Sequence, residues 1–99
     1  MQYVVLFEDN PDADPEIRNA HMQDHLGFLE AAGNVGAAGP LTTRDGAAAG
    51  GIWLVEAEDA AAVDALVKRD PFWPTGLRKS VQVLAWTQVF ADGQRKFGL

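Results

Sequence analysis

The chain has 99 residues and a mass of 10.7 kDa, the size of one domain with a single hydrophobic core. Hydrophobic residues make up 47% and charged residues 22% of it, a composition typical of a folded globular protein and not of a disordered chain. The net charge of -6 argues against general nucleic-acid binding, because phosphate backbones repel an acidic surface. The absence of cysteine excludes disulfides, zinc–thiolate sites, iron–sulfur clusters and thiol catalysis.

The first ten residues, MQYVVLFEDN, do not have the pattern of a signal peptide, since they contain no basic segment and only a short apolar run. No stretch of the sequence approaches the roughly 20 apolar residues that a transmembrane helix needs. We therefore expect a cytoplasmic protein that does not bind membranes.

The first elements predicted along the chain are a strand and a helix. Aromatic and β-branched residues over 3–7 are typical of a strand. Asp14 has the character of a helix N-cap, and Pro15 suits the first helical position. We expect this helix to run over 15–32 and to stop at Gly33.

Three strands and a second helix are predicted after the first helix. A Gly- and Ala-rich stretch over 35–43 indicates an irregular strand, and 51–57 is a clear strand with large apolar residues. Asp59 caps a second helix that ends near Asp70, because the following proline restricts the residue before it. A long strand is expected over 81–90.

The predicted order of elements is β-α-β-β-α-β, the pattern of a split βαβ, ferredoxin-like sandwich of the α+β class. We expect residues 1–99 to form one domain, with 92–99 as a tail that is mobile or used in assembly.

The predicted strands are apolar on both faces. Tyr3 and Val5 point to one side of the sheet and Val4 to the other, and Trp53 and Leu54 oppose each other in the same way. Two helices can cover only one face of a four-stranded sheet, which leaves the second face apolar and open. We therefore expect a homodimer in which the uncovered faces of two sheets pack together.

Arg18, His21 and His25 are the first candidates for a functional site. Residues three and four apart are neighbours on a helix surface, so the two histidines share one face with Arg18 at its edge. A partly buried imidazole beside a cation favours its neutral, basic form, which suits His21 as a general base. Arg18 and His25 would then contact the substrate. Both histidines could instead be core residues bonded to backbone carbonyls.

Asp70 is the second candidate and begins the segment DPFWPTG at 70–76. A carboxylate at the end of a helix faces the unfavourable end of the helix dipole, and such a placement indicates either compensation or a function. If Asp70 reaches His21, the two can act as an orienting group and a base. Phe72 and Trp73 would wall the pocket. The alternative is an Asp-Pro turn that ends the helix, with the two aromatic residues fixing the loop to the core.

Gly39 and Pro40 are the third candidate, because small residues let a ligand approach the backbone closely. The alternative is a bulge or bend in the strand. The spacing of His21 and His25 would also allow two metal ligands, but the sequence contains no other histidine and lacks the Glu of the His-Glu-x-x-His motif. We expect neither a metal nor a cofactor.

Four motifs in one order give the chain a resemblance to the YciI-like (YCII-related) family. They are RNAH at 18–21, AGPL at 38–41, DPF at 70–72, and Gly76 followed by a strand that ends in Trp86. Each motif is weak alone, but together they span nearly the whole chain.

This resemblance implies a ferredoxin-like domain that forms dimers within the dimeric α+β barrel superfamily. It also implies a His–Asp pair in a pocket and acid–base chemistry on small molecules. By position, His21 matches the family histidine and Asp70 matches the aspartate of the DP motif. The chain departs from the family in two respects. The common His-Leu dipeptide occurs here at His25-Leu26 and not at His21, and the segment between the first helix and AGPL differs slightly in length.

Three functions are compatible with these features. We favour a small acid–base enzyme, an isomerase, lyase or dehalogenase-like eliminase, in which His21 moves the proton, Asp70 orients it and Arg18 stabilises an anionic substrate. The second is a non-catalytic or regulatory dimer module that binds a small anion at Arg18 and His21. The third is a structural dimerisation domain with both histidines in the core.

Overall fold

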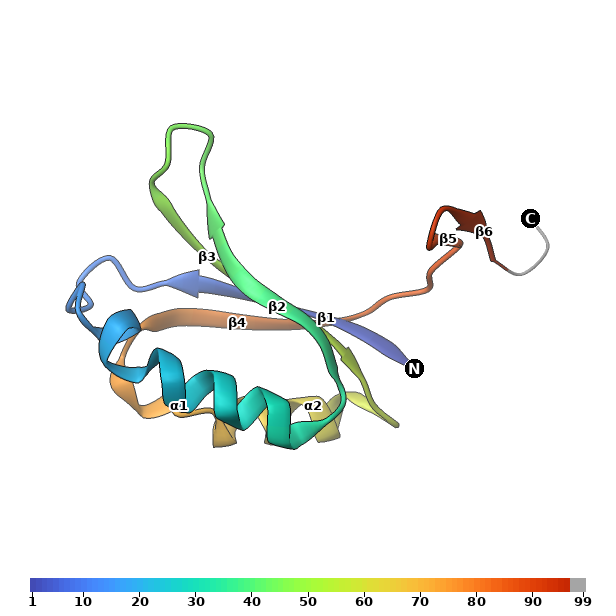
Figure 1. Ribbon diagram of the computed structural model, residues 1–99, viewed down its shortest axis with the longest axis horizontal. Coiled ribbons are helices and arrows are strands. Elements are labelled where there is room, and N and C mark those ends of the chain that lie inside the picture. The colour runs from blue at the N-terminus through green and yellow to red at the C-terminus, as the bar shows by residue number, and fades with distance from the viewer. Residues whose placement is uncertain (97–99) are drawn as a thin grey trace.

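The structure is a computed structural model that describes residues 1–96. Four strands form one antiparallel sheet in the order β2-β3-β1-β4, and both helices lie on the same side of it (Figure 1). The elements in chain order are β1 (Gln2–Asp9), α1 (Ile17–Ala32), β2 (Val35–Thr42), β3 (Ala48–Glu56), α2 (Ala60–Arg69), the 3-10 helix η1 (Trp73–Thr75) and β4 (Arg78–Ala85). The predicted ferredoxin-like α+β sandwich is confirmed.

β1 lies inside the sheet because it pairs with both β3 and β4. Val5, for example, lies opposite Trp53 on one side and Val83 on the other. Tyr3, Val5 and Phe7 alternate with less buried residues and face the helices, as the two-residue period of a strand requires. Together with residues of β3 and α2 they form the core, which consists of Tyr3, Val5, Phe7, Trp53, Val55, Val63, Leu66 and Val67.

The second face of the sheet is also apolar, as predicted. Val4 and Leu6 of β1 and Ile52 and Leu54 of β3 are half-buried, between the buried positions of the same strands. Leu84 of β4, which lies opposite Val4, is exposed. The two helices cover the other face only (Figure 1).

The two helices begin differently. Asp59 caps α2 as predicted, since its side chain accepts a hydrogen bond from the Ala62 N–H at 2.8 Å. The prediction for α1 is wrong at its start: the helix begins at Ile17 with Glu16 as N-cap, and no side chain caps it. Asp14 instead accepts from the Glu16 N–H at 2.9 Å, within the turn that precedes the helix.

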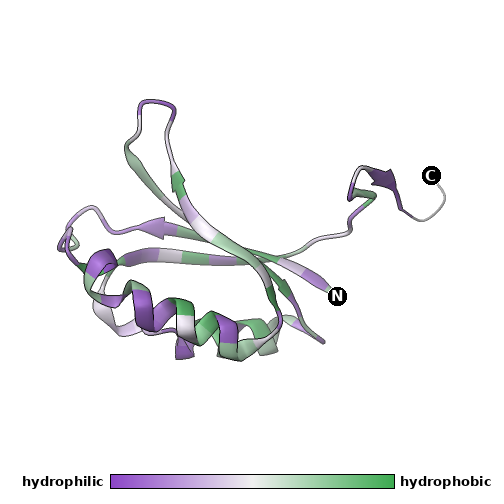
Figure 2. Cartoon of the chain, in the orientation of Figure 1, coloured by the Kyte–Doolittle hydropathy of each residue, from purple (hydrophilic) through white to green (hydrophobic). Residues whose placement is uncertain are grey.

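Figure 2 shows hydrophilic residues along much of α1. Within residues 1–96, no helix has both the length and the apolar character needed to cross a membrane.

The last predicted strand is too long at its C-terminal end. β4 ends at Ala85, which lies opposite Tyr3, and the Trp86 N–H makes a last bond to the Gln2 carbonyl. The following segment leaves the sheet and forms a small hairpin of β5 (Phe90–Ala91) and β6 (Gln94–Arg95), away from the rest of the domain (Figure 1). The predicted tail at 92–99 is described as far as residue 96, and its last three residues lie outside the described residues.

Candidate functional site

A cavity of about 110 Å³ lies between α1, the helix-facing side of the sheet and the segment after α2. Its wall is mostly apolar, with aromatic rings from β1, β3 and the segment after α2, and with two arginines, a carboxylate and an imidazole among them. The residues that line it include Phe7, Asp9, Arg18, His25, Leu26, Gly39, Pro40, Trp53, Phe72, Leu77 and Arg78.

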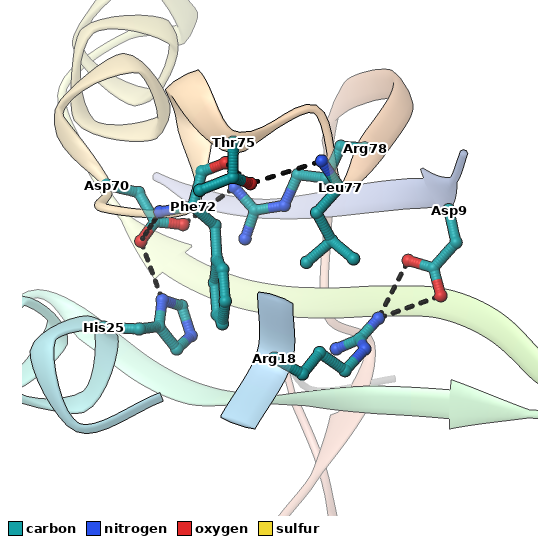
Figure 3. Close-up of polar contacts among 8 residues, drawn as sticks. All are labelled: Asp9, Arg18, His25, Asp70, Phe72, Thr75, Leu77 and Arg78. Atoms are coloured by element: carbon teal, nitrogen blue, oxygen red, sulfur yellow. Dashed lines mark hydrogen bonds and ion pairs between the residues drawn. The ribbon is translucent and has the colours of Figure 1, made fainter. Parts of the chain in front are cut away.

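His25 and Asp70 form a buried pair beside this cavity (Figure 3). The Nδ1 atom of His25 lies 2.8 Å from the Oδ1 atom of Asp70, and the two residues are 7% and 1% exposed. Asp70 is the C-cap residue of α2, and its Oδ1 also accepts a hydrogen bond from the Phe72 N–H at 3.2 Å. An ionised carboxylate can only accept, so Nδ1 is the donor of this bond, and in the neutral imidazole the lone pair is then on Nε2. The bond to Asp70 thus fixes the orientation of the ring and the tautomer of its neutral form.

Arg78 contacts the other oxygen of the same carboxylate. Its Nη1 atom lies 2.7 Å from Asp70 Oδ2, and within residues 1–96 neither atom has another hydrogen-bond partner. Burial is the largest influence on Asp70 and opposes its ionisation. The hydrogen bond from His25 and the charge of Arg78 outweigh burial and lower the pKa of Asp70 below its usual value. For Arg78, burial lowers the pKa of the guanidinium, and the negative charge of Asp70 opposes that effect.

A second charged pair lies on the other side of the cavity. The Nη2 atom of Arg18 donates to both carboxylate oxygens of Asp9, at 2.8 and 2.9 Å, and lies 3.5 Å from the Gly50 carbonyl oxygen. Figure 3 shows Phe72 and Leu77 between this pair and the His25–Asp70 pair. The Arg18–Asp9 ion pair is therefore separated from the His25–Asp70 pair by apolar side chains.

The structure brings together most of the predicted site residues, but His25 and not His21 contacts Asp70. Arg18, His25, Gly39, Pro40 and Phe72 line one cavity, and Asp70 lies behind the His25 ring.

The expected contact between Asp70 and His21 is absent, because the end of α2 lies opposite His25, one turn further along α1. His21 is half-buried, and its ring centroid lies 6.4 Å from that of Phe72. The imidazole of His21 makes no hydrogen bond within residues 1–96. Trp73 is 43% exposed and lies outside the cavity, beside Val81 and Val83 of β4. Among residues 1–96, no three His, Cys, Asp or Glu residues are placed to hold a metal ion.

The sequence reasoning missed Asp9 and Arg78. A signal for Asp9 was present, because it continues the alternation of Tyr3, Val5 and Phe7 and so falls on the helix-facing side of β1. No comparable signal exists for Arg78. A register shift between Glu8 and Asp9 places Arg78 opposite Asp9, and a bulge of this kind cannot be read from the pattern of β4 alone.

Comparisons with known proteins agree with this fold. The YCII-related domain family matches residues 1–87. The 5-chloro-2-hydroxyhydroquinone dehydrochlorinase TftG from Burkholderia phenoliruptrix, solved in complex with 2,5-dihydroxybenzoquinone, is 26% identical, with a TM-score of 0.72 over 88% of this chain and 94% of that one. The protein Rv0793 from Mycobacterium tuberculosis is 18% identical, with a TM-score of 0.50 over 88% and 94% of the two chains, and shows likeness of fold alone. No curated protein sequence matches.

The family match spans most of the chain and includes every element that builds the cavity, from β1 to β4. The resemblance predicted from RNAH, AGPL and DPF is confirmed, and the chain belongs to the YCII-related domain family.

Proposed function

We propose that the protein is an enzyme that catalyses proton transfer or elimination on a small ring compound, with His25 as the general base and Asp70 as the group that orients it. The buried 2.8 Å contact between His25 Nδ1 and Asp70 Oδ1, beside a cavity with aromatic walls, carries this proposal. A carboxylate–imidazole pair of this kind fixes the ring and stabilises the imidazolium that forms when the base accepts a proton. His25 thus replaces His21 in the role expected from the sequence.

The step that fits this pair is a base-assisted elimination or isomerisation. His25 Nε2 accepts a proton from an acidic hydroxyl or carbon of the substrate. The electron pair of the broken bond forms a new double bond. In an elimination, a leaving group departs with its own bonding pair. In an isomerisation, an existing double bond of the substrate opens, and its electron pair takes the proton back from the imidazolium at another atom.

The cavity favours a single small planar ring as substrate. Phe7, Trp53 and Phe72 supply aromatic surfaces, and the cavity volume of about 110 Å³ is of the same order as the roughly 150 Å³ of an engineered cavity that binds benzene. The dehydrochlorinase that resembles this chain was solved with a dihydroxybenzoquinone, which supports a hydroxylated ring as the substrate class.

Arg18 can stabilise a developing negative charge on such a ring. Its bonds to Asp9 and Gly50 all involve Nη2, which leaves Nη1 and Nε to donate to a substrate oxygen. The carboxylate of Asp9 already offsets the positive charge of Arg18. Arg18 is therefore better suited to stabilise a substrate oxygen that becomes negative during the reaction than to bind a substrate that is already a strong anion.

The test compares His25→Ala with His21→Ala on a panel of hydroxylated and chlorinated six-membered rings, with turnover and chloride release measured. Removal of a general base typically costs 10²–10⁴-fold in rate, so we expect a loss of about that size for His25→Ala and most of the activity to remain for His21→Ala. Full activity in the His25 variant would exclude the mechanism. A ring that stabilises the protein against heat but is recovered unchanged would instead indicate the non-catalytic binding module.

We also propose that the apolar second face of the sheet forms a homodimer interface. The exposed Leu84 and the half-buried Val4, Leu6, Ile52 and Leu54 support this, because a domain of this size rarely leaves such a face open to water. Leu6→Glu should convert the dimer to monomer in sedimentation equilibrium, whereas Ala61→Glu, on the exposed side of α2, should leave the dimer intact. A wild-type protein that sediments as a monomer would overturn the proposal.

A further inference from the structure

Arg78 lies in the cavity wall but takes no part in the mechanism above. Its side chain is 9% exposed, and its guanidinium lies over the ring of Phe7, 3.8 Å from the centroid, with Trp53 and Phe72 at 5.4 and 5.6 Å. Three aromatic rings around one cation hold it in a fixed place and partly replace its hydration. Such a rigid, buried charge must influence the titration of its neighbours.

The two oxygens of the Asp70 carboxylate have different partners, one an imidazole and the other a guanidinium. Oδ1 accepts from His25 Nδ1, and Oδ2 faces Arg78 Nη1 (Figure 3). A carboxylate beside an imidazole, acting alone, favours the protonated imidazolium and so removes the free base. A guanidinium on the second oxygen opposes that effect, because it offsets the carboxylate charge without occupying the imidazole.

The other charged groups around the cavity do not change this balance. The charged or titratable residues that line the cavity or adjoin it are Asp9 of β1, Arg18 and His21 of α1, Asp70 after α2 and Arg78 of β4, whereas the cavity residues of β2 and β3 are uncharged. Asp9 and Arg18 pair with each other at 2.8 Å. The remaining fixed charges are those of Asp70 and Arg78, one of each sign.

We propose that Arg78 is a positioning residue that keeps Asp70 ionised and offsets its charge, so that Asp70 orients His25 while His25 stays an unprotonated base near neutral pH. The catalytic consequence rests on the proposed function. The electrostatic part does not, since the protonation of His25 can be measured without any substrate.

The experiment follows the imidazole signals of His25 by NMR as a function of pH in the wild-type protein and three variants. Arg78→Gln removes the charge and keeps a hydrogen-bond donor for Asp70. Arg78→Lys keeps the charge. Lys79→Gln is the matched control, because Lys79 is the next residue on β4, exposed, and 3.9 Å from Glu8.

Loss of the Arg78 charge should raise the titration midpoint of His25, since the unopposed carboxylate then favours the imidazolium. A nearby charge shifts a titration by about one pH unit or more, so we expect a rise of that size in Arg78→Gln. Arg78→Lys and Lys79→Gln should stay within a few tenths of a unit of wild type. If the protein is active, the acidic limb of the kcat/KM profile of Arg78→Gln should move to higher pH by the same amount as the midpoint.

An unchanged His25 midpoint in folded Arg78→Gln would reduce Arg78 to a purely structural residue and overturn the proposal. If Arg78→Gln does not fold, Arg78→Met takes its place, because it also removes the charge and keeps an apolar side chain beside Phe7, Trp53 and Phe72. A rise of the His25 midpoint in that variant supports the proposal, and an unchanged midpoint or a full-unit shift in Arg78→Lys contradicts it. Failure of the proposed function has a different signature: His25 titrates as expected, but His25→Ala has no effect on turnover.

Discussion

The two helices lie side by side on one face of the sheet but serve different purposes. α2 buries Val63, Leu66 and Val67 in the core and is capped by a side chain at its start. α1 is longer, yet His25 is its one fully buried residue, and no side chain caps it. α2 therefore contributes the fully buried helical part of the core, whereas α1 packs against the core through partly buried residues and lines the cavity.

The polar cluster at the cavity lies where these two regions meet. Asp70 is the C-cap residue of α2, and its carboxylate contacts His25 of α1 and Arg78 of β4. A buried charge is tolerated only when it is paired and hydrogen-bonded. The end of the stabilising helix is thus also the support of the candidate base, and changes there should affect both stability and chemistry.

The largest effect is expected for Asp70→Ala, which tests whether the two helices depend on this junction. Removal of one partner of a buried ion pair costs about 3–5 kcal/mol, because the other charge stays buried without compensation. We expect a loss of that size in the free energy of unfolding, measured by urea denaturation at neutral pH. Asp64→Ala, on the exposed side of α2, should stay within about 0.5 kcal/mol of wild type.

The same carboxylate should make the wild-type protein sensitive to acid. The pKa of Asp70 is lower in the folded state than its usual value, so its contribution is complete above the unfolded-state pKa of about 3.9 and is lost as the pH falls through the folded-state pKa. The free energy of unfolding of Asp70→Ala should change less over this range than that of wild type. Parallel curves for the two proteins would show that the junction contributes no acid sensitivity.

The next effect compares a leucine from each helix. Leu66 of α2 is buried in the core, and Leu26 of α1 lines the cavity with 43% of its surface exposed. Leu66→Ala should lower the free energy of unfolding by about 3 kcal/mol, as is usual when a buried leucine is truncated. Leu26→Ala should cost less than about 1 kcal/mol, because most surface changes are small. Equal losses in urea denaturation would mean that α1 also packs as a core element.

The sequence predicted the stabilising region better than the site. The apolar stripe of α2, its cap at Asp59 and the alternation of β1 are local patterns, so they could be read directly and place the core correctly. The pairing of Asp70 depends on which turn of α1 lies opposite the end of α2. The position of His21 in the RNAH motif favoured that histidine in the sequence, and only the His-Leu dipeptide favoured His25.

The length of β4 shows the same limit. Val81–Phe90 has the composition of a strand throughout, but β4 ends at Ala85, and the chain that follows leaves the sheet instead of continuing along β1. The pairing of Arg78 with Asp70 likewise depends on the register between β1 and β4 and on the end of α2. These features arise from contacts between segments far apart in the chain, which periodicity and capping patterns do not encode.

The smallest predicted effect compares the starts of the two helices. Asp59 accepts a hydrogen bond from the Ala62 N–H and so satisfies one of the first free N–H groups of α2. Replacement of such a cap by alanine costs about 1 kcal/mol. Asp14 was expected to act in the same way for α1, but it bonds to the Glu16 N–H in the turn before the helix. In thermal or urea unfolding, Asp59→Ala should therefore lose about 1 kcal/mol and Asp14→Ala clearly less. Equal losses would mean that the Asp14 turn supports α1 as well as a true cap supports α2.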